Sequence, residues 1–263
     1  MISIPAVVPP LPREQTWKRN VSPAAAFGWL SAGWRDFKIQ PAASISYGVL
    51  VFLVSVVTVV GLFVLHLDYI LFPAFAGFMV AGPVIGIGLY EKSRRIEEGK
   101  PVSLWRMIFV KPESGGQILF AGVLLLGLML LWMRAAVILY ALFFGMQPFP
   151  GLDRIVPMLF TTEIGWAMLV VGSAVGGVFA AFAFAISAFS IPMLLTERKD
   201  ALTAMGTSMA LVWHNLPVML TWAAIMLVLI VIGIATGLLG MIVVFPVLGH
   251  GSWHAYRTMR PVS

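Results

Sequence analysis

Cysteine is absent from the 263-residue sequence, and charged residues make up only 11% of it. The absence of cysteine excludes disulfides, thiolate metal sites and a cysteine nucleophile. An ordinary soluble domain carries about 25% charged residues, so this chain does not belong to that class. Hydrophobic residues make up 60% of the sequence, and the mean hydropathy is +0.97. They form apolar runs of about 20 residues, the length at which a helix crosses a bilayer.

The net charge of +6 does not indicate a nucleic-acid partner. Nucleic-acid binding requires basic residues that cluster on one face, whereas these are scattered over separate short loops. In a membrane protein, such residues mark the loops that stay in the cytoplasm. We therefore expect the lipid bilayer and other membrane subunits as partners, and no nucleic acid.

The apolar runs predict an all-α, polytopic membrane helix bundle with six transmembrane helices. The predicted spans cover about residues 42–65, 69–90, 117–145, 164–195, 217–235 and 238–256. Two mildly amphipathic segments, 22–39 and 201–215, predict interfacial helices, because each is too short and too polar to span. For the first of them, a soluble helix packed beneath the bundle is an equally good interpretation.

The distribution of basic residues predicts the orientation. With six spans, both termini lie on one side, and all of the 17 Lys and Arg residues except Arg134 and Arg154 fall on that side. Such an asymmetry in short loops predicts cytoplasmic termini. We expect a multi-pass protein of the bacterial inner (cytoplasmic) membrane.

A short motif occurs twice and predicts an internal repeat. Residues 83–94 read PVIGIGLYEKSR, and residues 246–257 read PVLGHGSWHAYR. Both copies follow an interfacial helix, a span and a tight turn, so the repeat is parallel. The chain then divides into a flexible cytoplasmic tail (1–21), a first repeat (22–94), a cytoplasmic loop with the third and fourth spans (95–199), and a second repeat (200–263).

The glycines of this motif predict a helix crossing. Glycine removes side chains and lets two helix backbones approach closely in a membrane, so we expect the second and sixth spans to cross there. The residues to which we assign a helix-packing or structural role are Pro83, Gly86, Gly88, Glu91, Arg94, Pro246, Gly249, Gly251, Trp253 and Arg257.

Three histidines are candidates for a cofactor site. His250 and His254 are four residues apart and so share one helical face, and His214 is predicted on the same side of the membrane. One interpretation is a metal, haem or proton site. The other is structural: Glu91 bonds to His254, and His250 bonds to a carbonyl freed by Pro246. No metal motif surrounds these residues, so we expect no metal and no cofactor, and we identify no catalytic residue.

Two charged residues fall at or within the predicted spans. Arg134 lies among apolar residues, and Glu163 begins the fourth span. An ionisable residue inside a span indicates a function by default. Arg134 is also compatible with reaching outward to the membrane surface, or with pairing to Glu163 or Asp153.

The sequence resembles an uncharacterised family of predicted integral membrane proteins of proteobacteria. The resemblance rests on GW at 33–34, GLYEKSRRIEEG at 88–99, IPMLL at 191–195 and GHGSWHAYR at 249–257. Some family members are labelled as cytochrome c oxidase subunits. This chain lacks the many spanning histidines of a haem–copper catalytic subunit, so the label would imply an accessory role.

Taken together, these features predict a non-catalytic protein rather than an enzyme. We expect an accessory, scaffold or assembly subunit of a larger respiratory or photosynthetic complex in electron transport. A small-solute or ion transporter with a pathway between the two repeats is the alternative. A histidine-ligated haem or metal protein is a third possibility.

Overall fold

The computed structural model describes residues 17–145 and 149–260, and this part of the chain is helical with no strand. The helices are α1 (Ala25–Lys38), α2 (Pro41–Val64), η1 (Asp68–Ile70), α3 (Leu71–Ile85), α4 (Ile87–Glu97), α5 (Leu104–Ile108), α6 (Gly115–Phe144), α7 (Leu152–Thr161), α8 (Glu163–Ser187), α9 (Ser190–Thr196), α10 (Ala201–His214), α11 (Leu216–Ala235) and α12 (Met241–Met259). The predicted all-α class is confirmed.

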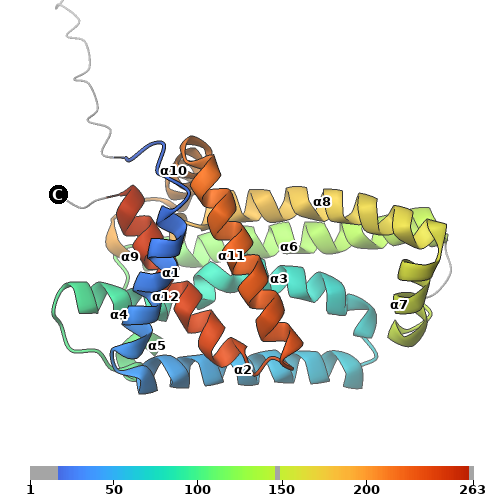
Figure 1. Ribbon diagram of the computed structural model, residues 1–263, viewed down its shortest axis with the longest axis horizontal. Coiled ribbons are helices and arrows are strands. Elements are labelled where there is room, and N and C mark those ends of the chain that lie inside the picture. The colour runs from blue at the N-terminus through green and yellow to red at the C-terminus, as the bar shows by residue number, and fades with distance from the viewer. Residues whose placement is uncertain (1–16, 146–148, 261–263) are drawn as a thin grey trace, which may run out of the picture.

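The helices α2, α3, α6 and α8 run in the direction of the long axis of the molecule, and α11 and α12 cross that direction obliquely (Figure 1). The helices α1, α4, α5, α9 and α10 lie toward one end, which we call the α4 end. Helix α7 lies at the opposite end, the α7 end. Arg154 lies in α7, and Arg134 lies in the second half of α6.

Four segments are long and apolar enough to cross a membrane. They are Pro41–Val64, Gly115–Phe144, Glu163–Thr196 and Leu216–Ala235. They correspond to the first, third, fourth and fifth predicted spans. The second and sixth predicted spans take another form, because α3 has only 15 residues and α12 contains His250, His254 and Arg257 among its 19.

The two copies of the repeated motif differ in their backbone. Pro83 lies inside α3, which ends two residues later, and α4 starts after Gly86. Proline has no N–H to donate and so weakens a helix at this point. Pro246 lies inside α12, which continues without a break to Met259. The same local motif therefore ends one helix and is tolerated in the other.

Exposed apolar side chains cover the long helices. Val57, Leu142 and Val178 are 71%, 74% and 70% exposed, and the last buried residue of α2 is Val51. A soluble monomer exposes apolar patches of at most a few hundred Å². Hydrophobic sides this long require lipid or partner helices around them, so the chain is an integral membrane protein.

The buried core lies toward the α4 end. Its largest fully enclosed side chains include those of Trp222, Trp253, Tyr256 and Phe189. Asn215 is also fully buried, and it accepts a hydrogen bond from Val21 N at 3.1 Å and donates one to Lys18 O at 3.0 Å. These bonds hold residues 17–21, the described part of the predicted tail, against the junction of α10 and α11. Residues 1–16 lie outside the described residues.

Helices α11 and α12 form a hairpin whose turn follows Ala235. The Thr236 hydroxyl accepts a hydrogen bond from Gly240 N at 2.8 Å, and both Gly237 and Leu238 have a positive φ, of 66° and 69°. The start of α12 packs on α2 at Gly48, where a Cβ atom would lie 2.1 Å from Ile242 O. Gly48 is in the first half of α2, so the hairpin turn lies beside that half and not level with Val64.

Candidate functional site

A row of buried polar side chains connects α1, α2, α4 and α12 near the α4 end. Its members are Asp36, Ser44, Lys92, Ser93 and His250, and the exposed fraction of each is 5% or less. Four separate helices contribute to this row, and His250 is at its centre. We call these five residues the buried polar chain.

Hydrogen bonds join four members of the buried polar chain in sequence, and the fifth, Asp36, lies beside Ser93. Lys92 Nζ donates to Ser44 Oγ at 2.7 Å and to Gln40 O at 3.3 Å. Ser44 Oγ lies 3.0 Å from His250 Nε2, and His250 Nδ1 lies 2.8 Å from Ser93 Oγ. The Asp36 carboxylate lies close enough to the Ser93 hydroxyl for that hydroxyl to lower its pKa. The chain therefore runs from a buried ammonium group to a buried carboxylate.

The chemistry of the two ends sets the direction of the hydrogen bonds. An ammonium group only donates, and a carboxylate only accepts. Ser44 accepts from Lys92, so its own proton is directed to His250 Nε2. Ser93 lies beside the acceptor-only carboxylate of Asp36 and is thus placed to accept from His250 Nδ1–H. This arrangement favours the neutral Nδ1–H tautomer of His250.

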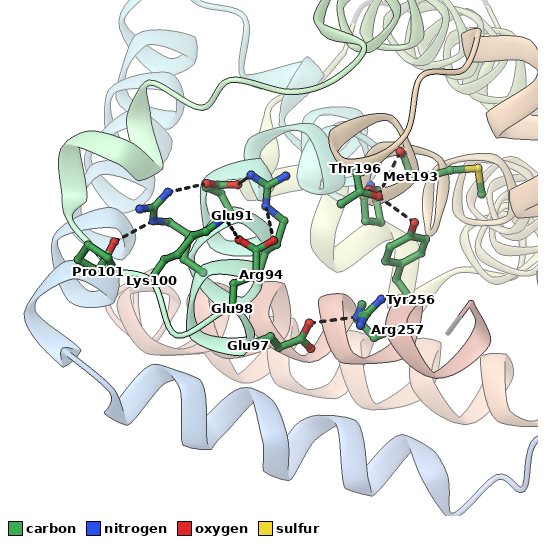
Figure 2. Close-up of polar contacts among 12 residues, drawn as sticks. Glu91, Arg94, Glu97, Glu98, Lys100, Pro101, Met193, Thr196, Tyr256 and Arg257 are labelled. Carbon is green, nitrogen blue, oxygen red and sulfur yellow. Dashed lines mark hydrogen bonds and ion pairs between the residues drawn. The ribbon is translucent and has the colours of Figure 1, made fainter. Parts of the chain in front are cut away.

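Beyond Asp36, the polar contacts continue to the protein surface. His254 Nε2 lies 2.9 Å from Asp36 Oδ2, and His254 Nδ1 lies 3.9 Å from Glu97 Oε1. Arg257 Nε donates to Glu97 Oε2 at 3.0 Å, as Figure 2 shows. The side chains of Glu97 and Arg257 are both 31% exposed. These contacts fix the last turns of α12 to α1 and α4.

Burial and local charge set the acid–base properties of the two ends. Burial opposes ionisation of Asp36, but hydrogen bonds from His254 and Ser93 outweigh that effect and keep the pKa of its carboxyl group below the usual value. Burial lowers the pKa of Lys92 to about 8, although the negative charge of Asp36 acts in the opposite direction. Lys92 is therefore a buried cation that loses its proton far more readily than a lysine in water.

Glycines allow the helices to approach closely enough for short side chains to meet. A Cβ atom on Gly33 would lie 2.5 Å from Val247 O, and one on Gly48 would lie 2.1 Å from Ile242 O. Both distances are shorter than any real Cβ contact, so α1 and α2 reach the α12 backbone only through glycine. Ser44 can then reach His250 although serine has a short side chain.

The structure places the three candidate histidines in different surroundings. Both ring nitrogens of His250 are engaged by serine hydroxyls, so the predicted bond to a carbonyl freed by Pro246 is wrong. His254 bonds to Asp36, and His214 Nδ1 bonds to Ala210 O of its own helix. In the described residues, no group of three or more His, Asp or Glu side chains could hold a metal ion.

Glu91 does not pair with His254, so that prediction is also wrong. Its carboxylate lies 2.9 Å from Arg94 Nη2 and 3.5 Å from Arg95 Nη1, within α4 itself (Figure 2). Because α4 places Arg94 and Arg95 three and four residues after Glu91, these cations meet it on one helix face. His254 finds its carboxylate partner on α1 instead.

The predicted crossing of the repeat glycines takes a different form. Helices α4 and α12 pack together, and a Cβ on Gly249 would lie 2.5 Å from Leu89 Cδ1. Gly88, however, packs against Met107 O of α5, and Gly251 against Trp222 of α11. Each glycine thus serves a separate contact. Close to them, Trp253 is 1% exposed and its ring lies 5.6 Å from that of Tyr256.

The second polar cluster at the α4 end involves Glu197, next to α9. Tyr256 Oη donates to Glu197 Oε1 at 3.0 Å, and Arg260 Nη2 donates to Glu197 Oε2 at 2.7 Å. Tyr256 Oη also lies 3.0 Å from Thr196 Oγ1, as Figure 2 shows. This cluster fixes the C-terminal end of α12 to α9, and sequence reasoning missed it.

Arg134 is exposed on α6, and among the described residues it forms no ion pair with Asp153 or Glu163. That predicted pairing is wrong, and the outward-reaching interpretation stays a prediction. Glu163 lies in the first turn of α8. Its negative charge there stabilises the helix, because the N-terminal end of a helix carries a partial positive charge. Neither residue is connected to the buried polar chain.

One family model matches part of the chain. It is described as "Predicted integral membrane protein (DUF2189)", and it matches residues 71–196. That segment contains α3 to α9, including Lys92 and Ser93, and excludes α1, α2 and α12. The chain is thus similar to this family over slightly less than half of its length. No curated protein and no solved structure matches it.

Proposed function

We propose that this protein is a non-catalytic accessory, scaffold or assembly subunit that associates with a larger respiratory or photosynthetic complex in the bacterial inner membrane. The observation that carries the proposal is a row of small residues on the exposed side of α8. Ser173, Gly177 and Ala181 are spaced four residues apart, and all three are exposed. A Cβ on Gly177 would meet no atom within 4 Å.

Rows of small residues at this spacing are typical of contacts between membrane helices, because they let backbones approach closely. The row lies beside large exposed side chains such as Val170 and Val178. A partner helix could therefore pack closely on α8 and cover apolar surface on both sides.

The use of the polar side chains supports a non-catalytic role. The members of the buried polar chain bond to one another, and the Glu197 cluster bonds α12 to α9. Among the described residues, these groups hold helices together, and none of them lines the cavity between α8 and α11. Catalysis requires a positioned acid, base or nucleophile that can reach a substrate.

For topology, we propose six crossings, with α3 and α12 as the second and sixth and with both termini in the cytoplasm. The position of all basic residues other than Arg134 and Arg154 supports this orientation. The α11–α12 hairpin would cross obliquely. A reporter fused after Ser263 tests the orientation, because a periplasmic reporter would contradict it.

The association is tested by purification in a mild detergent, with identification of co-purifying subunits by mass spectrometry. We expect wild type to retain defined membrane subunits and Gly177→Leu to lose them. Gly61→Leu on α2 is the matched control, since its added side chain also meets open space. Subunits retained equally by all three proteins, or by none, would contradict the proposal.

The transporter alternative receives less support from the structure. A cavity does lie at the level of Pro83 and Gly249, but its lining is almost entirely apolar. An ion or a polar solute crosses a membrane through polar or charged groups, and this cavity presents few. The haem or metal alternative is also weaker, because both ring nitrogens of His250 already have partners.

A further inference from the structure

A large apolar cavity lies between α8 and α11. Its volume is about 720 Å³, and α3, α4, α6, α10 and α12 also contribute to its wall. It extends from Tyr90 and Ser252, toward the α4 end, to Trp132 and Gly176, further along the long helices. Pockets that bind small molecules have volumes of about 300–1,000 Å³, so this space could enclose a ligand of substantial size.

The cavity opens sideways onto the apolar surface. Three of its lining residues, Trp213, Leu220 and Leu227, are 74%, 61% and 51% exposed. Helix α11 packs on α12, α1 and α10, whereas α8 packs on α6, α7 and α10. The two helices on either side of the opening both contact α10, but they do not pack closely on each other. A molecule that moves within the bilayer could enter between them.

The wall presents a hydrogen-bond donor that the protein does not use. The Tyr90 hydroxyl, on a side chain 3% exposed, makes no hydrogen bond to any described residue. A buried donor without an acceptor is unfavourable. Such a donor in an apolar wall indicates a ligand that is mostly hydrocarbon and carries an acceptor oxygen.

We propose that this cavity binds one acyl chain of a membrane phospholipid, with the ester carbonyl near the Tyr90 hydroxyl. Water does not fill an apolar cavity, because it needs two to four polar partners. An acyl chain is thin, flexible and abundant in the surrounding bilayer.

The ends of the cavity match the two ends of such a lipid. Tyr90 and Ser252 contribute hydroxyl groups toward the α4 end, and the exposed ring of Trp213 lies at the rim. Tryptophan is enriched at the level of the lipid headgroups. Further along, the chain would contact Phe78, Leu227 and Ile230.

The test is native mass spectrometry of the full chain, purified in a mild detergent and supplied with a phosphatidylglycerol of defined acyl length. Ala223→Phe places a ring in the cavity, and Ala180→Phe does so from α8. Ala174→Phe, at an exposed position on α8 outside the cavity, is the matched control. Tyr90→Phe removes only the hydroxyl, with Tyr140→Phe on α6 as its control.

We expect wild type and both controls to retain one phospholipid after delipidation. The two cavity-filling variants should lose at least 90% of it at unchanged unfolding temperature. Tyr90→Phe should lower phospholipid affinity several-fold but leave the affinity for an ether analogue without the carbonyl unchanged. Equal retention by all proteins, no retention by wild type, or a retained quinone in place of phospholipid would overturn the proposal. If one filling variant fails to fold, the other decides the matter.

Discussion

Replacing Lys92 with methionine should remove a pH dependence from the stability of this protein. Lys92 is fully buried, and burial lowers its pKa to about 8 from the usual 10.5. The unfolded chain therefore binds more protons than the folded chain between these two values. Stability rises with pH wherever the unfolded state binds more protons. The cost of the buried charge is fully present below pH 8 and is relieved as the pH rises.

The magnitude follows from the two pKa values. From pH 7.5 to pH 9.5, a range in which tyrosines with an ordinary pKa of about 10 stay mostly protonated, the free energy of unfolding should rise by about 2 kcal/mol. For a protein of this size, that corresponds to an unfolding temperature higher by about 4–8 °C. Lys92→Met keeps the length of the side chain and removes the charge, so its stability should not show this rise.

The assay is thermal unfolding in detergent, followed by tryptophan fluorescence at half-unit pH steps. Lys38→Met, at an exposed position on α1, is the control and should behave as wild type does. Identical pH profiles for wild type and Lys92→Met would refute the reasoning.

Three further predictions concern the contacts around the core. Asn215→Ala should lower the free energy of unfolding by about 2–3 kcal/mol, since it leaves Val21 N and Lys18 O without their partner. Denaturant titration against the exposed control Thr58→Ala checks this, and equal stability would contradict it. Gly48→Leu should abolish stable expression, whereas Gly61→Leu should express normally, because only the side chain added at position 48 meets Ile242 O. Size-exclusion profiles distinguish the two variants. Normal behaviour of Gly48→Leu would refute the close packing of α2 on α12. Asp36→Asn should destabilise the protein at pH 7, where the low-pKa carboxylate is ionised. The difference in unfolding free energy between wild type and Asp36→Asn should shrink as the pH falls below 3.8 and Asp36 becomes protonated. A difference that does not change with pH would contradict this.

Much of the architecture could be predicted, because hydrophobic run length and charge position are local properties of the chain. The helical class and four of the membrane-length segments follow from runs such as Pro41–Val64 and Leu216–Ala235. The break near Pro83 and the oblique path of the α11–α12 hairpin could not be predicted. Both depend on which helix packs at Gly48 and Gly88, and a sequence pattern does not encode that choice of partner.

The buried polar chain was only partly predictable. His250 and His254 could be identified as candidates from the sequence, because histidine occurs only 4 times in it and these two lie on one helical face. Asp36 and Lys92 carry no comparable signal, because charged residues are almost never fully buried. Their burial depends on partners on other helices: Asp36 bonds to His254, 218 positions away, and Lys92 bonds to Ser44, 48 positions away. The signal that could have indicated Asp36 is that it is the one acidic residue in an otherwise aromatic and basic segment.

The measurement that tests the buried polar chain most directly is the protonation state of His250. Selective ¹⁵N labelling of histidine, with the His250 signal assigned by its loss in His250→Gln, would report both ring nitrogens in the folded protein. We predict a neutral ring with the proton on Nδ1 and slow exchange with water, because Lys92 directs the Ser44 proton toward Nε2. A doubly protonated ring, or a proton on Nε2, would contradict the account.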